Sequence, residues 1–255
     1  SLAFKERNNL IPIPTTLEKI GNAIIFTFAG HDTTGHTLTW LIYELAKNNK
    51  YQKILHNEVD QFWKDQCNDV ITYKNFKRLP FMTKCIMETL RLWPALTNGT
   101  YRELEEDDYI TDFDGNKLIL EKGTWIQIPN WTRHRNKELW GEDADIFNPY
   151  REFKEDEDWD GCVIASYNPN SPRFSPFTYG PRDCIGKNFA QIEMRIILLF
   201  LLQKFEFTLA TNQMNMDEEW LSLNTLTMGP RDPYNSNKMG LYVNINKRDK
   251  YTSKL

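Results

Sequence analysis

The sequence lacks the features that mark membrane-spanning, disulfide-bonded and nucleic-acid-binding proteins. No stretch approaches the ~18 consecutive apolar residues that cross a bilayer, and no signal peptide is visible. The four cysteines show no paired spacing, which argues against a disulfide framework and fits a reducing compartment. A net charge of −4 argues against the basic surface that nucleic-acid-binding proteins use. His31 and His36 fall on different faces of a helix, so no zinc site is expected.

The 255 residues, 40% of them apolar, are enough to bury a substantial core. Helical spacing of apolar residues alternates with short stretches of strand-like alternation, which predicts a mainly α fold with small β-sheets. The acidic segments Glu103–Asp108 and Glu155–Asp160 are expected to be solvated loops. The predicted helices span 17–46, 50–63, 80–92 and 188–203, and the predicted strands lie near 117–128 and 241–246.

The most specific motif is a glycine-flanked turn around Cys184 that reads F-x-x-G-x-R-x-C-x-G, followed at once by an apolar helical run. A cysteine thiolate is a metal ligand, and the positive end of the following helix favours the thiolate. Gly180 and Gly186 let the backbone approach a flat macrocycle. Arg182 offers a fork of donors that suits a haem propionate, and Phe177 can shield the sulfur from water.

A lone cysteine before a helix is most often a small buried hydrophobe, and that alternative applies to Cys184. The arginine and glycines at their offsets favour a haem ligand instead. With them the segment resembles the haem-binding loop of the cytochromes P450, in which a thiolate pushes electron density onto iron and favours O–O cleavage. The resemblance implies haem b (iron protoporphyrin IX), with Cys184 as the axial ligand.

A second segment, Ala29-Gly30-His31-Asp32-Thr33-Thr34, resembles the family's distal helix motif A-G-x-D/E-T-T/S. Ala29 and Gly30 leave room for dioxygen beside the porphyrin, and a threonine that bonds back to the helix can bend it. The resemblance implies that Asp32 and Thr33 are catalytic, as an acid–alcohol pair that relays protons to the oxygen side of the haem. The alternative is that Gly30 ends one helix and a polar residue caps the next.

A third match is Glu88-Thr89-Leu90-Arg91, the family's E-x-x-R. Such pairs on solvated helices are common and contribute only about 0.2–0.5 kcal/mol, but the apolar neighbours here predict a buried pair. Phe147-Asn148-Pro149-Tyr150-Arg151 resembles F-x-P-x-R, so Arg151 is expected to complete a structural Glu–Arg–Arg network. The aromatic residue that usually follows this arginine is displaced by one position, to Phe153.

Roles are also expected for residues at three places where the motifs are less specific. Arg102 follows the Glu88 helix where the family often has an arginine that binds a propionate. His134 is interpreted as a hydrogen-bonded turn histidine. The tip of a C-terminal hairpin, near Leu226 and Thr227, is expected to reach the substrate.

The resemblance implies a haem-thiolate monooxygenase, or its C-terminal catalytic part, acting on a small apolar organic substrate. Its electron donor would be an NADPH-dependent reductase or another redox protein, in the cytoplasm or at the cytoplasmic face of a membrane. The resemblance covers only the C-terminal half of the family. Residues 1–255 are therefore expected to form one truncated domain that lacks the family's N-terminal segment. The alternative is a non-catalytic haem-binding or remnant protein.

If helices of the family's N-terminal half are absent, the distal helix should expose apolar side chains. We expect this exposed face around Ile24, Ile25, Phe26 and Phe28.

Overall fold

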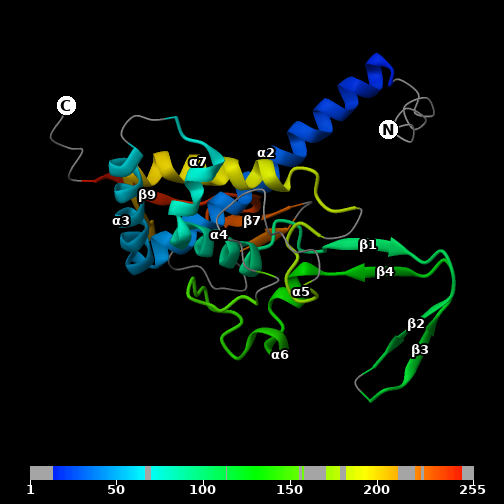
Figure 1. Ribbon diagram of the computed structural model, residues 1–255. Helices are drawn as coiled ribbons and strands as arrows, with labels where there is room; N and C mark the ends of the chain where they lie inside the picture. Colours follow the sequence, from blue (N-terminus) through cyan, green and yellow to red (C-terminus); the bar gives the residue numbers. More distant parts are fainter. Residues whose placement is uncertain are drawn as a thin grey trace.

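The computed structural model of the chain describes residues 14–66, 70–112, 114–154, 157, 171–178, 182–211, 222–224 and 227–248. Helices dominate these residues, and the strands form small antiparallel sheets (Figure 1). All four predicted long helices are present, and their observed ends differ from the predicted ends by at most a few residues. The mainly α fold predicted from apolar spacing is therefore confirmed.

Four helices build the body of the molecule, and a 3-10 helix, η1, precedes the third of them. The first helix starts with a capping box, in which Thr15 accepts from the Glu18 amide and the Glu18 side chain accepts from the Thr15 amide. The third starts with Pro80, which loses no helical hydrogen bond at this position. The bounds are α2 Thr16–Lys47, α3 Asn49–Gln66, η1 Tyr73–Arg78, α4 Pro80–Leu92 and α7 Lys187–Lys204.

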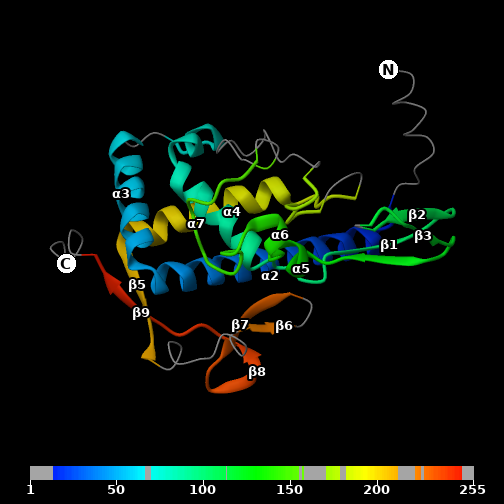
Figure 2. The ribbon, with the colours of Figure 1, turned by 90° about the horizontal axis from the view of Figure 1, so that it is seen from below.

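Two short helices, α5 (Asn130–His134) and α6 (Lys137–Trp140), follow the strands that come after α4. Strands β1 and β4 form one hairpin and β2 and β3 extend it, while β5 pairs with β9, and β7 lies between β6 and β8 (Figure 2). All described pairings are antiparallel. The bounds are β1 Thr100–Glu103, β2 Asp108–Thr111, β3 Lys117–Leu120, β4 Trp125–Ile128, β5 Phe205–Leu209, β6 Ser222–Asn224, β7 Met228–Asp232, β8 Asn235–Met239 and β9 Val243–Lys247.

The core lies where α2, α3, α4 and α7 pack together. Trp40 of α2 stacks on Trp93, just after α4, with ring centroids 3.8 Å apart and planes inclined by 1°. The indole N–H of Trp40 donates to the Met228 carbonyl at 3.0 Å, so the same side chain also fastens β7 to α2. Buried aromatic rings therefore fix both α4 and the C-terminal sheet relative to α2.

The two halves of α2 have different environments. Its C-terminal half is buried in the core from Thr34 onward, whereas its N-terminal half projects from the body (Figure 1). Ile24 is 64% exposed, Ile25 59%, Phe26 50% and Phe28 49%. The exposed apolar face expected from the sequence is confirmed.

Within the part of the chain that the structure describes, no helix is both long and apolar enough to cross a membrane.

Candidate functional site

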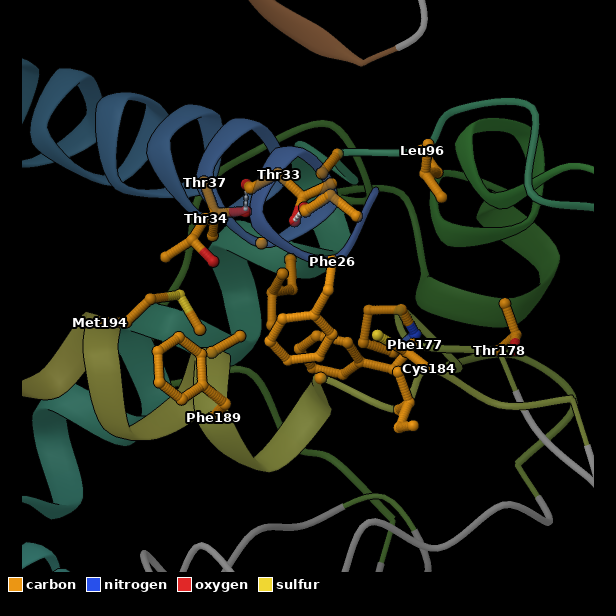
Figure 3. A pocket seen from close by; sticks show the side chains of 18 of the residues that line it. Phe26, Thr33, Thr34, Thr37, Leu96, Phe177, Thr178, Cys184, Phe189 and Met194 are labelled. Atoms are coloured by element: carbon orange, nitrogen blue, oxygen red, sulfur yellow. Dashed lines mark hydrogen bonds between the residues drawn. The ribbon is translucent and has the colours of Figure 1, made fainter. Parts of the chain in front are cut away.

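A cavity of about 340 Å³ lies between α2 and the loop that carries Cys184 (Figure 3). The N-terminal part of α7 and the residues that follow α4 close its sides. Most of the lining is apolar. The residues that line it include Ala29, Gly30, Thr33, Thr34, Thr37, Leu90, Ala95, Leu96, Phe177, Arg182, Cys184, Gly186, Phe189 and Met194.

Cys184 is exposed and free, and it lines this cavity. Its amide donates to the Phe177 carbonyl at 3.0 Å, which closes the cysteine loop at its base. Thr178 adopts a positive φ of 58°, unusual for a β-branched residue, and its hydroxyl donates to the Arg182 carbonyl. Helix α7 begins at Lys187, directly after Gly186. The loop therefore holds the thiol just before a helix N-terminus.

The other residues predicted around the cysteine lie close to it where they are described. Phe177 and Arg182 line the cavity, and Gly186 lies beside the sulfur, where an added Cβ would be 3.8 Å from Sγ. Among the described residues, Arg182 has no acidic partner, so its guanidinium is available to an anionic group in the cavity. Gly180 lies outside the described residues.

Helix α2 faces the cysteine loop across the cavity through small and hydroxyl side chains and through the Phe26 ring (Figure 3). A Cβ added at Gly30 would meet nothing within 4 Å, so open space lies in front of this residue. The Thr33 hydroxyl donates to the Ala29 carbonyl at 2.8 Å. The Thr34 hydroxyl is buried and has no hydrogen-bond partner among the described residues. The helix is unbroken here, so the alternative that Gly30 ends a helix is wrong.

Asp32 points away from the cavity, toward the sheet formed by β6, β7 and β8. Its carboxylate accepts a hydrogen bond from the Thr227 hydroxyl and lies 3.8 Å from Nδ1 of His36. Thr33, the next residue, lines the cavity. The two members of the predicted acid–alcohol pair therefore face different surroundings. Thr227 meets Asp32 and does not line the cavity, and Leu226 lies outside the described residues.

Glu88, Arg91 and Arg151 meet in one buried network. The fully buried Glu88 carboxylate binds Arg91 in a fork, Oε2 to Nε at 2.7 Å and Oε1 to Nη2 at 2.8 Å. Arg151 Nε donates to the same Oε1 at 3.1 Å. Arg91 also donates to the carbonyls of His134 and Ala144. The network joins α4 to the segment that follows α6.

His134 links this network to the cysteine loop. It ends α5, is completely buried, and packs against the Phe174 ring with centroids 5.5 Å apart. The Ser175 amide donates to its Nε2 at 3.4 Å. Burial lowers the pKa of His134 well below its ordinary value, and the charge of Arg133 lowers it further. The ring is therefore neutral and accepts from the backbone just before the cysteine loop.

Glu157 corrects one sequence-based expectation. Its segment was expected to be a solvated loop, but the Glu157 side chain is buried. It binds Arg173 in a fork, with the shortest contact 2.7 Å, and accepts from the Ser171 hydroxyl at 2.5 Å. A local charge pattern could not predict this burial, because the cationic partner, Arg173, lies 16 residues further along the chain. The displaced aromatic Phe153 packs against Phe174 in the same region, with centroids 5.0 Å apart.

Arg102 lies apart from these groups. It is exposed on β1, and its guanidinium donates to the neighbouring Tyr101 carbonyl at 2.8 Å. It is not among the residues that line the cavity.

Sequence motifs gave no role to several residues that line the cavity. Thr37 lies one turn beyond Thr33 on α2, and Phe189 and Met194 lie on α7. Leu90, Ala95 and Leu96 come from the end of α4 and the segment after it. The sequence could have indicated Thr37, because it lies four residues after Thr33 and residues four apart share a helix face. The others depend on how the elements pack.

The comparisons with known proteins match most of the chain to one family. The cytochrome P450 family model matches residues 5–232. Rat cytochrome P450 4F3 is 35% identical over 71% of this chain and 32% of its own length. Cytokinin hydroxylase of Arabidopsis thaliana is 38% identical over 73% of this chain and 33% of its own length. The chain thus spans about a third of the length of these curated relatives.

A crystal structure of a cytochrome P450, CYP102L1, superposes with a TM-score of 0.69. It is 26% identical, and the match covers 91% of this chain and 46% of that one. The family consists of haem-thiolate monooxygenases, and the cavity between α2 and the cysteine loop lies where the sequence motifs predict the haem. The chain belongs to the cytochrome P450 family.

Proposed function

We propose that this chain is the haem-binding, catalytic part of a monooxygenase that inserts one oxygen atom of dioxygen into an apolar organic substrate. A single observation carries the proposal: Cys184 and two residues of α2, Gly30 and Thr33, line the same cavity (Figure 3). A thiolate ligand and an oxygen-side helix must face each other across a haem.

The residues present fit haem b. Cys184 is free and lines the cavity, so its sulfur would be able to bind the haem iron. Arg182 is a cation at the cavity with no acidic partner among the described residues, which suits a propionate. Phe177 and Phe189 add apolar surface to the walls, and Gly186 keeps side-chain bulk away from the sulfur. Arg102 stays a proposed propionate ligand on the family pattern alone.

When bound, the haem supplies dioxygen activation and the transfer of oxygen to substrate. The residues of α2 handle protons. The Thr33 hydroxyl donates to the Ala29 carbonyl, so its oxygen remains free to accept a hydrogen bond in the cavity. Asp32 is 30% exposed, so solvent reaches its carboxylate on the other side of the helix. We propose, on the family motif, that the two residues relay protons from solvent to the cavity, although in this structure their side chains point to different sides of α2.

The apolar lining favours an apolar substrate, because a polar one would lose its hydration without compensation. The electrons are proposed to come from a reductase or another redox protein, since no electron carrier other than the haem is implied by these residues.

The test is carbon monoxide binding to the reduced, haem-loaded protein. Thiolate ligation gives the red-shifted Soret band typical of the family. Cys184→Ser is expected to abolish this band, because an alcohol replaces the thiolate. Cys85→Ala is the matched control, since Cys85 is fully buried in the core and does not line the cavity.

If the Cys184→Ser protein kept the band, the ligand assignment would be wrong. If the parent protein showed the band but consumed no electrons with any reductase, the non-catalytic haem-binding alternative would replace the monooxygenase.

A further inference from the structure

A hydrogen-bonded cluster of three polar side chains lies on the side of α2 that faces away from the cavity. His36 Nδ1 is 2.8 Å from the Thr227 hydroxyl oxygen, and that hydroxyl donates to Oδ2 of Asp32. Asp32 and His36 are one helical turn apart, and Thr227 comes from the start of the C-terminal sheet. No sequence motif predicted the cluster.

The direction of these hydrogen bonds follows from the donors available. A carboxylate only accepts, so the Thr227 hydroxyl must give its single proton to Asp32. The hydroxyl oxygen can then only accept from His36, which requires the proton on Nδ1. The chain therefore runs from imidazole N–H to hydroxyl to carboxylate, and every link can pass a proton toward Asp32.

The sheet holds Thr227 firmly against α2. The next residue, Met228, accepts from the Trp40 indole at 3.0 Å and donates its amide to the Ala95 carbonyl at 3.0 Å. Gly229 makes room for the imidazole, since a Cβ there would lie 2.9 Å from Cδ2 of His36. Thr227 is 2% exposed. These contacts keep the hydroxyl in place between the two α2 side chains.

The charged groups around His36 come from its own helix. Burial lowers the pKa of His36, the Asp32 carboxylate raises it, and His31 lowers it. On β7, the uncharged Gly229 lies against the ring, and a Cβ there would also lie 2.7 Å from the uncharged sulfur of Met239 on β8. The His36 side chain is 20% exposed, so the imidazole can exchange protons with solvent.

Resting on the proposed function, we propose that His36 and Thr227 are positioning residues that hold Asp32 and pass protons to it. A proton enters at the imidazole, Nδ1–H is given to the Thr227 oxygen, and the hydroxyl proton passes to Oδ2 of Asp32. Only protons move, so no oxidant or further reactant is required. Asp32 therefore receives protons from His36 through the Thr227 hydroxyl as well as from bulk water.

The first test reads the histidine itself and needs no catalysis. Nitrogen-15 NMR of the purified chain is expected to show neutral His36 with its proton on Nδ1. Thr227→Val keeps the shape of the side chain and removes the hydroxyl, so the Nδ1 signature is expected to be lost. Thr39→Val is the control, because that hydroxyl bonds to the Gly35 carbonyl of the same helix, outside the cluster.

Asp32→Asn is expected to lower the titration midpoint of His36, because the carboxylate favours the charged ring. A wild-type His36 that carries its proton on Nε2 would overturn the proposal, since the Thr227 proton would then be directed at His36 and away from Asp32.

The second test measures product formed per electron consumed by the haem-loaded enzyme with its reductase. Thr227→Val and His36→Phe are expected to lower this ratio, with an increased solvent isotope effect, while Thr227→Ser restores it. Thr39→Val should match the parent. An unchanged ratio in Thr227→Val would overturn the relay and mean that water supplies Asp32 directly. If Cys184→Ser kept the red-shifted Soret band, the proposed function would be refuted. The NMR result on His36 would still stand, because it does not depend on the haem.

Discussion

At the scale of single residues, Glu44 shows how strongly burial changes a side chain. Glu44 is a buried residue of α2, and its carboxyl group accepts a hydrogen bond from the Trp93 indole at 2.8 Å. Burial raises the pKa of Glu44 from its ordinary value of 4.5 to about 7, although Trp93 and Lys47 act in the opposite direction. The folded protein therefore keeps this proton at pH values where the unfolded chain releases it. The free energy of unfolding should fall as pH rises from about 4.5 to 7.

Glu44→Gln should remove this loss, because the amide cannot ionise and retains an oxygen for Trp93. With about 1.4 kcal/mol for each pKa unit between 4.5 and about 7, the variant should be roughly 3 kcal/mol more stable than the parent at pH 8. The two should be nearly equal at pH 5. Urea unfolding at both pH values measures the difference, and a gap that did not change with pH would contradict the buried, protonated carboxyl.

Thr33→Ala should keep haem binding and the thiolate spectrum but divert electrons to peroxide or water. The Thr33 hydroxyl lines the cavity, and it donates its hydrogen bond to the Ala29 carbonyl of its own helix, so its loss should affect proton delivery and not the position of the cysteine. Positioned proton transfer typically contributes ~10²–10⁴-fold, so product per electron should fall by roughly tenfold or more. Peroxide and product are quantified together, and equal yields in variant and parent would exclude the relay role.

At the scale of elements, charged side chains join segments that have no backbone pairing. Glu88 and Arg91 on α4 reach the carbonyls of His134 and Ala144 and the side chain of Arg151. His134 then accepts from the Ser175 amide. The path runs from α4 through the loops after α5 and α6 to the residues before Cys184. These loops derive their positions from buried polar contacts.

Glu88→Ala should therefore lower haem content and folded yield together. It would leave the fully buried Arg91 without its carboxylate, while Arg151 would keep Asp143 at 2.9 Å. Breaking a buried pair costs about 3–5 kcal/mol of a typical stability of about 5–15 kcal/mol. Thermal unfolding and haem content per chain measure both effects.

The control is Glu142→Ala, which removes the exposed Lys137–Glu142 pair and should change stability by less than about 1 kcal/mol. Normal haem content and stability in Glu88→Ala would show that the loops are held by other contacts.

At the scale of the whole molecule, the notable feature is the projecting N-terminal half of α2 (Figure 1). Its apolar side chains are half exposed or more, with Leu17 at 79% and Ile24 at 64%. Contiguous apolar surface of this kind favours association with other molecules. The described chain offers no cover for it.

The purified chain should self-associate through this face. Ile24→Ser combined with Ile25→Ser should reduce the average mass measured by analytical ultracentrifugation. The melting temperature should change little, because both side chains are largely exposed in the folded state. Ile146→Ser, a change at a separate exposed isoleucine, is the control. Association that persists unchanged in the double variant would place the contact elsewhere.

The sequence by itself determined the helices, the family and the residues around the cysteine. Each depends on short-range physics: apolar spacing within one helix, or glycine, arginine and cysteine at fixed offsets in one turn. The buried Glu88–Arg91 pair was predictable for the same reason, because residues three apart share a helix face.

Only the tertiary structure decided which groups meet across the chain. The Thr227 hydroxyl reaches Asp32, Arg173 neutralises Glu157, and Phe189 closes the cavity, although no local pattern indicates any of these contacts. A carboxylate's sequence neighbours do not reveal whether it will be solvated or buried beside a distant donor. That outcome depends on how helices and sheets pack, and packing brings together residues that the sequence keeps far apart.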